Sequence, residues 1–123
     1  MKSSIQLKID WMGPSTNAIY AGMHWQKRKR IADEAHLATK IAARGCRMAV
    51  SAVSISFQPM IRGRCYDTSN HSFAAKCIED GLVRAGVLPD DTNRWVKRII
   101  INAPEKIKKP EQSHMLVTVT ELE

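Results

Sequence analysis

Cysteines and long hydrophobic runs are scarce in this sequence of 123 residues. It has three cysteines, Cys46, Cys65 and Cys77, and no Cys-x-x-Cys pair. An odd number of unclustered cysteines argues against a disulfide framework and a zinc site, so we expect reduced thiols in a cytoplasmic protein. No window approaches roughly 18 consecutive apolar residues, which argues against a membrane-spanning helix, and the first residues lack the apolar run of a secretory signal.

Acidic residues are also few compared with basic ones. The chain has 12 Asp and Glu against 19 Lys and Arg, for a formal net charge of +7. The whole excess lies in residues 24–64, which carry nine basic and two acidic residues. Residues 65–91 reverse the sign, with five acidic and two basic residues. Solvated helix faces produce such blocks as readily as a nucleic-acid site does, so charge alone leaves both interpretations open.

What the sequence does contain is a globular composition, 44% hydrophobic and 25% charged, of a length that fits one domain over residues 1–123. Apolar periodicity predicts the order strand, helix, strand, helix, strand, strand. This order favours a single α+β domain with two main helices on one side of a small mixed sheet, whose last two strands pair as a hairpin. The predicted strands cover residues 4–10, 48–57, 95–101 and 115–122, and the predicted helices cover residues 23–44 and 69–85.

Glycine and proline predict where these elements stop. Residues 11–23 contain several of them and are expected to form an irregular loop. Pro59 and Gly63 indicate a second loop after the second strand. Gly45 and Gly86 stand where a glycine would end each helix.

Carboxylates lie at both ends of the second predicted helix. Asp67 precedes it, and Asp90 and Asp91 follow it. A helix of about 17 residues is about 25 Å long, so Asp67 and Asp91 meet only if the following loop folds back along the helix. Spacing alone therefore does not predict a metal site.

Simpler roles are available to the same residues. Asp67, Ser69 or Asn70 could cap the helix, a contribution of about 1 kcal/mol. Lys76 and Asp80 are four residues apart and could form an ordinary surface ion pair. Asp90 and Asp91 could be plain turn residues after a proline.

The order of short motifs along the chain gives a more specific signal. Residues 67–70 read Asp-Thr-Ser-Asn, and an Asp-Gly-Leu, an Ala-Gly and an Asp-Asp begin at Asp80, Ala85 and Asp90, after Lys76. Upstream, residues 14–20 read Pro-Ser-Thr-Asn-Ala-Ile-Tyr, and His-Trp-Gln-Lys-Arg follows at residues 24–28. Taken together, residues 14–91 resemble the RusA-like Holliday junction resolvases, many of which are encoded by phages or prophages.

That resemblance implies a homodimeric endonuclease of a bacterial or phage-infected cytoplasm. Such an enzyme uses Mg²⁺, with Mn²⁺ as a possible substitute, and cuts paired strands of four-way DNA junctions in recombination or repair. The implied metal ligands are Asp67 and Asp91, with Asp90 as a further ligand or orienting group, and Lys76 stabilises developing charge. The implied accessory residues are Asn17, Tyr20, Asn70 and Asp80.

The basic residues are the expected DNA contacts. Arg62 and Arg64 flank the proposed catalytic loop, whereas four consecutive cations fan round the first predicted helix. Trp25 and Trp95 could stack on bases, although packing in a core or dimer is the simpler expectation for both. His71 is expected on the helix surface. The candidate DNA-binding residues are Lys27, Arg28, Lys29, Arg30, Arg62 and Arg64.

One position departs from the family pattern. The second acidic residue of its Asp-x-Asp-Asn cluster is Ser69 here. A hydroxyl is a weaker ligand for a hard cation than a carboxylate. The sequence is therefore also compatible with a non-catalytic, structure-selective DNA-binding protein on the same scaffold.

Overall fold

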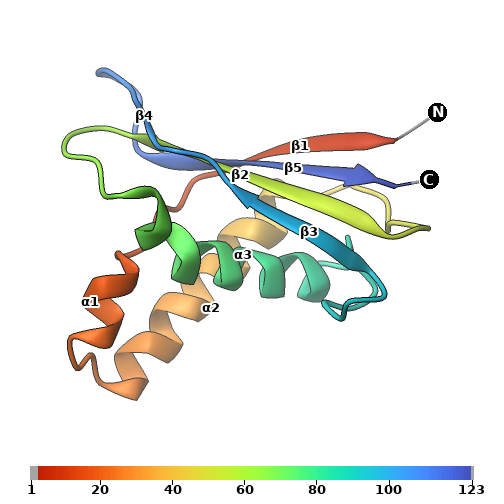
Figure 1. Cartoon of the computed structure of the whole chain (residues 1–123), viewed down its shortest axis with the longest axis horizontal. Helices are drawn as coiled ribbons and strands as arrows, with labels where there is room; N and C mark the ends of the chain where they lie inside the picture. The colour runs from red at the N-terminus through yellow and green to blue at the C-terminus, as the bar shows by residue number, and fades with distance from the viewer. Residues whose placement is uncertain (1–2, 123) are drawn as a thin grey trace.

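The computed structural model describes residues 3–122, and the chain ends of that part lie side by side (Figure 1). Strand β1 (Ser4–Ile9) pairs antiparallel with β5 (His114–Glu121), the last strand. Strand β5 also pairs antiparallel with β2 (Val53–Ile61). Strand β3 (Val96–Ile101) then pairs parallel with β2 on its other side. The described residues therefore form a mixed sheet in the order β1-β5-β2-β3.

The central strand β2 explains the first difference from the sequence prediction. Its residues alternate between buried and half-buried from Val53 to Ile61, so Pro59 lies within the strand and not in a loop. Pro59 falls between the residues of β2 that pair with β3 and Met60, which pairs with the two-residue strand β4 (Glu105–Lys106). A proline is tolerated there because the ladder on that side is already interrupted.

The predicted hairpin between the last two strands is wrong. Strands β3 and β5 do not pair with each other, because β2 lies between them. The chain connects β2 to β3 through a helix, and this crossover makes β2 and β3 parallel neighbours. The side of β3 where a hairpin partner would pair is therefore taken by β2 and not by β5. Strand β5 instead returns to the middle of the sheet, between β1 and β2.

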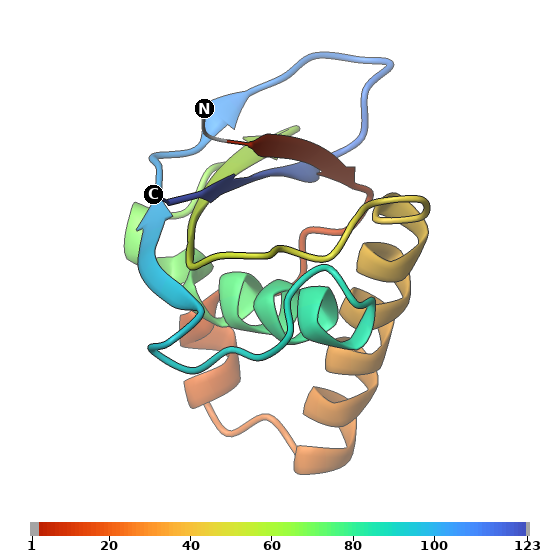
Figure 2. The same cartoon turned by 90° about the vertical axis from the view of Figure 1, so that its right-hand side faces the viewer.

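The helices cover one face of this sheet, as Figure 2 shows from the side. Helix α2 (Trp25–Ala42) and helix α3 (Ser72–Arg84) pack against each other beneath the strands. The single-domain α+β architecture is thus confirmed. The largest fully buried side chains between the two layers include Phe57, Ile9, Ile55, Ile78, Leu82, Leu88 and Met115.

The segment expected to be an irregular loop contains a short helix, α1 (Thr16–Tyr20). The side chain of Ser15 caps it by accepting the backbone N–H of Ala18 at 3.1 Å. The sequence did not predict this helix, because it has five residues, too few for an apolar periodicity, and follows a glycine and a proline at residues 13 and 14. The second predicted helix is likewise divided into a 3-10 turn, η1 (Thr68–His71), and α3.

The chain reverses sharply where α3 ends. Gly86 adopts a φ of 81°, a conformation that glycine accepts without strain. The N–H of Gly86 bonds to the carbonyl of Val83, and the N–H of Val87 bonds to the carbonyl of Leu82. This pair of bonds is the Schellman motif, which turns the chain back along the helix it has just left.

Candidate active site

The loop after α3 returns Asp91 to the side of that helix. Oδ2 of Asp91 lies 2.9 Å from Nζ of Lys76, fifteen residues earlier in the chain. Lys76 stands near the start of α3, and the reversal at Gly86 supplies the change of direction that this contact needs. The loop after α3 thus folds back along the helix and brings Asp91 to the part of α3 near its start.

Two further carboxylates of α3 contact the same ammonium group. Nζ of Lys76 lies 3.2 Å from Oε1 of Glu79 and 3.3 Å from Oδ1 of Asp80. Carboxylate oxygens of Glu79, Asp80 and Asp91 all lie within 4.8 Å of one another. Their side chains are 10%, 40% and 35% exposed, so the cluster is anchored in the protein at Glu79 and opens to solvent at the other two.

These contacts set the charge state of the cluster. The hydrogen bond to Asp91 raises the pKa of Lys76, with Glu79 and Asp80 adding to the effect and partial burial opposing it. The hydrogen bond and positive charge of Lys76 lower the pKa of Asp91 below its usual value. Lys76 is therefore cationic and Asp91 anionic at neutral pH.

The structure does not bring Asp67 and Asp90 into this cluster. Asp67 is exposed at the start of η1, and among residues 3–122 it joins no group of three metal-type ligands. Asp90 is also exposed, and its Oδ1 accepts the backbone N–H of Asp91 at 2.8 Å. Sequence reasoning missed Glu79, which could have been found from its position three residues after Lys76 on α3. The surface pair between Lys76 and Asp80 is confirmed.

Two of the motifs that suggested a family, residues 14–20 and residues 67–70, lie against each other. The backbone N–H of Asn17 donates to Oδ1 of Asn70 at 3.3 Å, which joins α1 to η1. Asn17 and Asn70 therefore have a structural contact, and Tyr20 is 82% exposed at the far end of α1. A part in binding or catalysis for these three residues stays a prediction.

A threonine that sequence reasoning overlooked caps α3 from outside the helix. Oγ1 of Thr16 accepts the N–H of Phe73 at 3.0 Å and donates to the carbonyl of Asn70 at 3.1 Å. Oγ of Ser72 lies 2.9 Å from the same hydroxyl. The residue before α3, His71, makes no capping bond with its own side chain, so the cap comes from α1.

His71 is buried rather than on the helix surface. Only 2% of it is exposed, and its ring lies 5.6 Å from the ring of Tyr66. Within the described residues its Nε2 atom has no hydrogen-bond partner. Burial lowers the pKa of His71, because the charged ring would lose its hydration.

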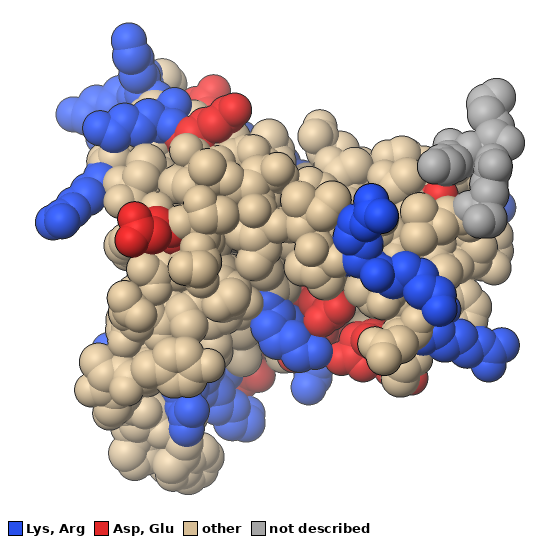
Figure 3. Space-filling view, viewed as in Figure 1, with Lys and Arg blue, Asp and Glu red and all other residues tan. Residues whose placement is uncertain are grey.

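The predicted DNA contacts fall into two groups. The four cations of residues 27–30 are exposed in the first turns of α2, and Lys29 pairs with Asp33 at 3.1 Å. Arg62 and Arg64 follow the end of β2, on the connection that leads to Asp67. In the view of Figure 3, Asp and Glu atoms gather over α3 with Lys and Arg atoms on either side.

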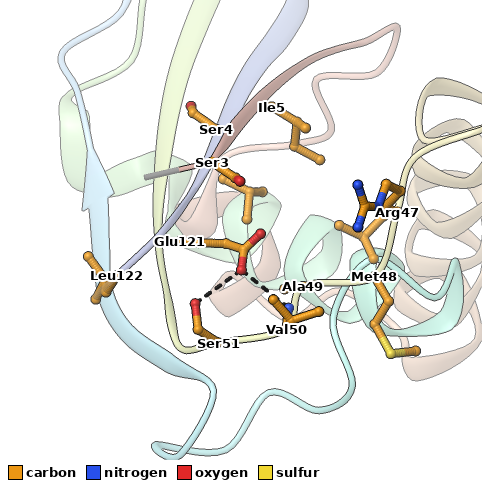
Figure 4. Close-up of a pocket in the computed structure, with 12 residues that line it drawn as sticks. Ser3, Ser4, Ile5, Arg47, Met48, Ala49, Val50, Ser51, Glu121 and Leu122 are labelled. Atoms are coloured by element: carbon orange, nitrogen blue, oxygen red, sulfur yellow. Dashed lines mark hydrogen bonds between the residues drawn. The ribbon is translucent and has the colours of Figure 1, made fainter. Parts of the chain in front are cut away.

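A separate pocket lies between the N-terminal end of β1, the C-terminal end of β5 and the connection from α2 to β2 (Figure 4). Its volume is about 430 Å³, and its lining includes Arg47, Val50 and Glu121. Oε2 of Glu121 accepts the N–H of Val50 at 3.3 Å and the hydroxyl of Ser51 at 3.0 Å. The lining of this pocket includes none of the catalytic, metal-binding or DNA-binding residues predicted from the sequence.

The carboxylate cluster matches what a hard divalent cation requires. Oxygen donors are the ligands that Mg²⁺ prefers, and Glu79, Asp80 and Asp91 offer three carboxylates at close range. Lys76 already places a positive charge among them. Such a site can hold a metal ion, and the donor set alone does not fix which one.

No protein-family model matches the chain. A search of the curated proteins likewise finds no match.

No helix in residues 3–122 combines the length and the hydropathy needed to cross a membrane.

Proposed function

We propose that this protein is a metal-dependent endonuclease that cuts four-way DNA junctions as a homodimer. The observation that carries the proposal is the return of Asp91 to Lys76, beside Glu79 and Asp80. This arrangement supports the activity implied by the resemblance to RusA-like resolvases. Enzymes that hydrolyse phosphodiesters commonly gather carboxylates in this way to hold a cation against a phosphate.

The residues of α3 and its following loop have distinct parts in this proposal. Glu79, Asp80 and Asp91 would hold the cation, and the resemblance implies Asp67 and Asp90 as additional ligands. A bound Mg²⁺ supplies polarisation of the phosphoryl oxygen and a nucleophilic hydroxide. Lys76 exchanges its carboxylate contacts for the negative charge that develops on the scissile phosphate.

The cations of the chain position the substrate. Arg62 and Arg64 bind phosphates on the side of the connection to η1, and residues 27–30 bind them from α2. A dimer with two-fold symmetry presents two equivalent clusters to the two symmetric strands of a junction. The result is paired cleavage rather than a single nick.

Two observations favour a second candidate, a DNA-binding protein that does not cut. Ser69 replaces a carboxylate, and Lys76 contacts every member of the carboxylate cluster. A lysine held this way competes with a divalent cation for the same oxygens. Junction binding without metal-dependent cleavage identifies this second candidate.

Cleavage of a labelled synthetic junction tests the proposal. The protein is incubated with the junction in Mg²⁺, in Mn²⁺ and in chelator, and the products are separated on a denaturing gel. We expect paired cuts with either metal and none in chelator. An intact junction under both metal conditions refutes the nuclease proposal. Asp91→Asn, with Asp10→Asn at an exposed position outside the cluster as a surface control, assigns any cutting to the carboxylate cluster.

A further inference from the structure

The turn between α1 and α2 exposes two aromatic side chains at one end of the molecule. Tyr20, the last residue of α1, is 82% exposed, and Trp25, the first residue of α2, is 58% exposed. Figure 1 shows this turn at the end of the helical layer that lies farthest from the sheet. We call residues 20–30 the aromatic tip. Trp25 is therefore not a core residue.

The aromatic tip is rigidly attached to the rest of the protein. The ring of Trp25 stacks on that of His24 with centroids 5.8 Å apart. Nδ1 of His24 accepts the N–H of Gln26 at 3.2 Å and so caps α2. The other side of the tip is anchored by α1, through the bonds of Thr16 to the start of α3. These contacts hold the backbone on both sides of the turn in place, and the ring of Trp25 also has a stacking partner before any nucleic acid binds.

Positive charge surrounds these rings. Four consecutive cations, residues 27–30, follow Trp25, and the first turn of α2 carries no acidic residue. Within the described part of the chain, Lys27, Arg28 and Arg30 form no ion pair, whereas Lys29 pairs with Asp33. The N-terminus of α2 adds its own partial positive charge at the same end.

We propose that the aromatic tip binds unstacked bases of single-stranded or branched nucleic acid. Trp25 and Tyr20 stack on bases, and Lys27, Arg28 and Arg30 contact the adjoining phosphates. Exposed aromatic side chains beside cations are how proteins bind single strands, and each stacked base is worth about 5- to 140-fold in affinity. Binding of this kind needs neither a metal ion nor a cut strand, so it goes beyond the proposed cleavage.

A membrane surface is the competing partner for such a mixture of aromatics and cations. Interfacial helices bury a broad apolar face and keep their cations on the opposite face. Here the four consecutive cations of residues 27–30 point around the whole circumference of α2, which leaves no such apolar face at the tip. The charge pattern therefore favours a polyanion that surrounds the tip over a flat lipid surface.

Tryptophan fluorescence tests the proposal directly. Replacing Trp11 and Trp95 with Phe leaves Trp25 as the one tryptophan, since the chain has three. This variant is titrated in chelator with oligo(dT), with a four-way junction, with inorganic polyphosphate and with anionic phosphatidylserine vesicles. We expect strong quenching with oligo(dT) and the junction, and little change with polyphosphate. Equal quenching by polyphosphate overturns the stacking, and a blue shift with vesicles alone overturns the nucleic-acid partner.

Binding by substituted full-length chains provides an independent readout. Fluorescence anisotropy of labelled oligo(dT) is measured for Trp25→Ala, Trp25→Phe and the matched control Leu37→Ala. Leu37 is 60% exposed on the same helix but lies away from the tip. We expect about tenfold weaker binding for Trp25→Ala, with most affinity restored by Phe and none lost in the control. Unchanged affinity in Trp25→Ala refutes the proposal even if junctions are cut, whereas stacking without any cleavage refutes only the nuclease.

Discussion

A Cβ atom placed on Gly81 of α3 would lie 2.9 Å from Oγ1 and from Cβ of Thr39 in α2. Thr39 is fully buried, and its hydroxyl donates to the carbonyl of Ala35 at 2.8 Å. The two helices therefore cross at this pair of residues with no room for another methyl group. This contact fixes the distance between the helix that carries the aromatic tip and the helix that carries the carboxylate cluster.

The first prediction follows from this crossing. Gly81→Ala adds a methyl group where overpacking costs about 1–3 kcal/mol, more than the roughly 1 kcal/mol that alanine gains over glycine in a helix. We expect a lower free energy of unfolding, measured by urea denaturation. The double substitution Thr39→Ala with Gly81→Ala should recover part of the loss. A Gly81→Ala protein as stable as the wild type would contradict this close crossing.

The second prediction concerns Thr16 as a cap supplied by another helix. Thr16→Val keeps the shape but leaves the N–H of Phe73 and the carbonyl of Asn70 without this partner. Loss of a cap typically costs about 1–2 kcal/mol, and we expect that decrease in the free energy of unfolding. Thr16→Ser retains the hydroxyl and serves as the control. Equal losses in the two variants would mean that the methyl group, not the hydroxyl, is important.

The third prediction separates Asp91 from its neighbour Asp90. Asp91→Asn removes the charge that contacts Lys76, whereas Asp90→Asn leaves the carboxylate cluster intact. We expect Asp91→Asn to weaken Mn²⁺ binding strongly, measured by calorimetry, with a smaller effect for Asp90→Asn. The melting temperature of Asp91→Asn should change little, because a partly exposed ion pair contributes little to stability. Equal metal affinities of the two variants would separate Asp91 from metal binding.

The fourth prediction is a loss of stability in mild acid. Burial lowers the pKa of His71 from its ordinary 6.5, so the unfolded chain binds the proton more readily than the folded protein. Stability is therefore full above about pH 6.5 and declines as the pH falls towards the folded pKa. His71→Phe should flatten this decline, and His24→Gln, at an exposed position, should not. Chemical denaturation at several pH values provides the measurement, and identical slopes for His71→Phe and the wild type would exclude the mechanism.

Much of the fold could be predicted from local pattern. The alternation in β1 and β5 placed both strands within about one or two residues, because period-two burial is a direct consequence of a one-faced sheet. Strand β2 was predicted to end too early because Pro59 normally ends a strand, and only the interrupted partner side makes it acceptable. The predicted start was also wrong, because residues 48–52 lie outside the strand. The pairing of the strands could not be predicted, for a different reason. The insertion of β5 between β1 and β2 depends on contacts far apart in sequence.

The candidate site shows the same division. The ion pair of Lys76 with Asp80 could be predicted because both lie on one helix face. The contact of Lys76 with Asp91 could not, because it depends on the path of the chain after Gly86. Motif reading placed Asp67 and Asp90 with Asp91 as ligands, and the structure groups Asp91 with Glu79 instead. Metal binding by these carboxylates stays a prediction, which the Asp90 and Asp91 variants test for those two residues.

The Schellman turn at Gly86 has a consequence for how such a site can change over evolution. Val87 and Leu88, the first two residues after the turn, are fully buried in the core, so packing as well as length fixes the path from Gly86 to Asp91. Insertion or deletion of a single residue between Leu88 and Asp91 would shift Asp91 relative to Lys76, whereas a polar residue at position 87 or 88 would disturb the packed layer itself. Distant relatives of this protein are therefore expected to keep both the length of that loop and the two apolar residues at its start.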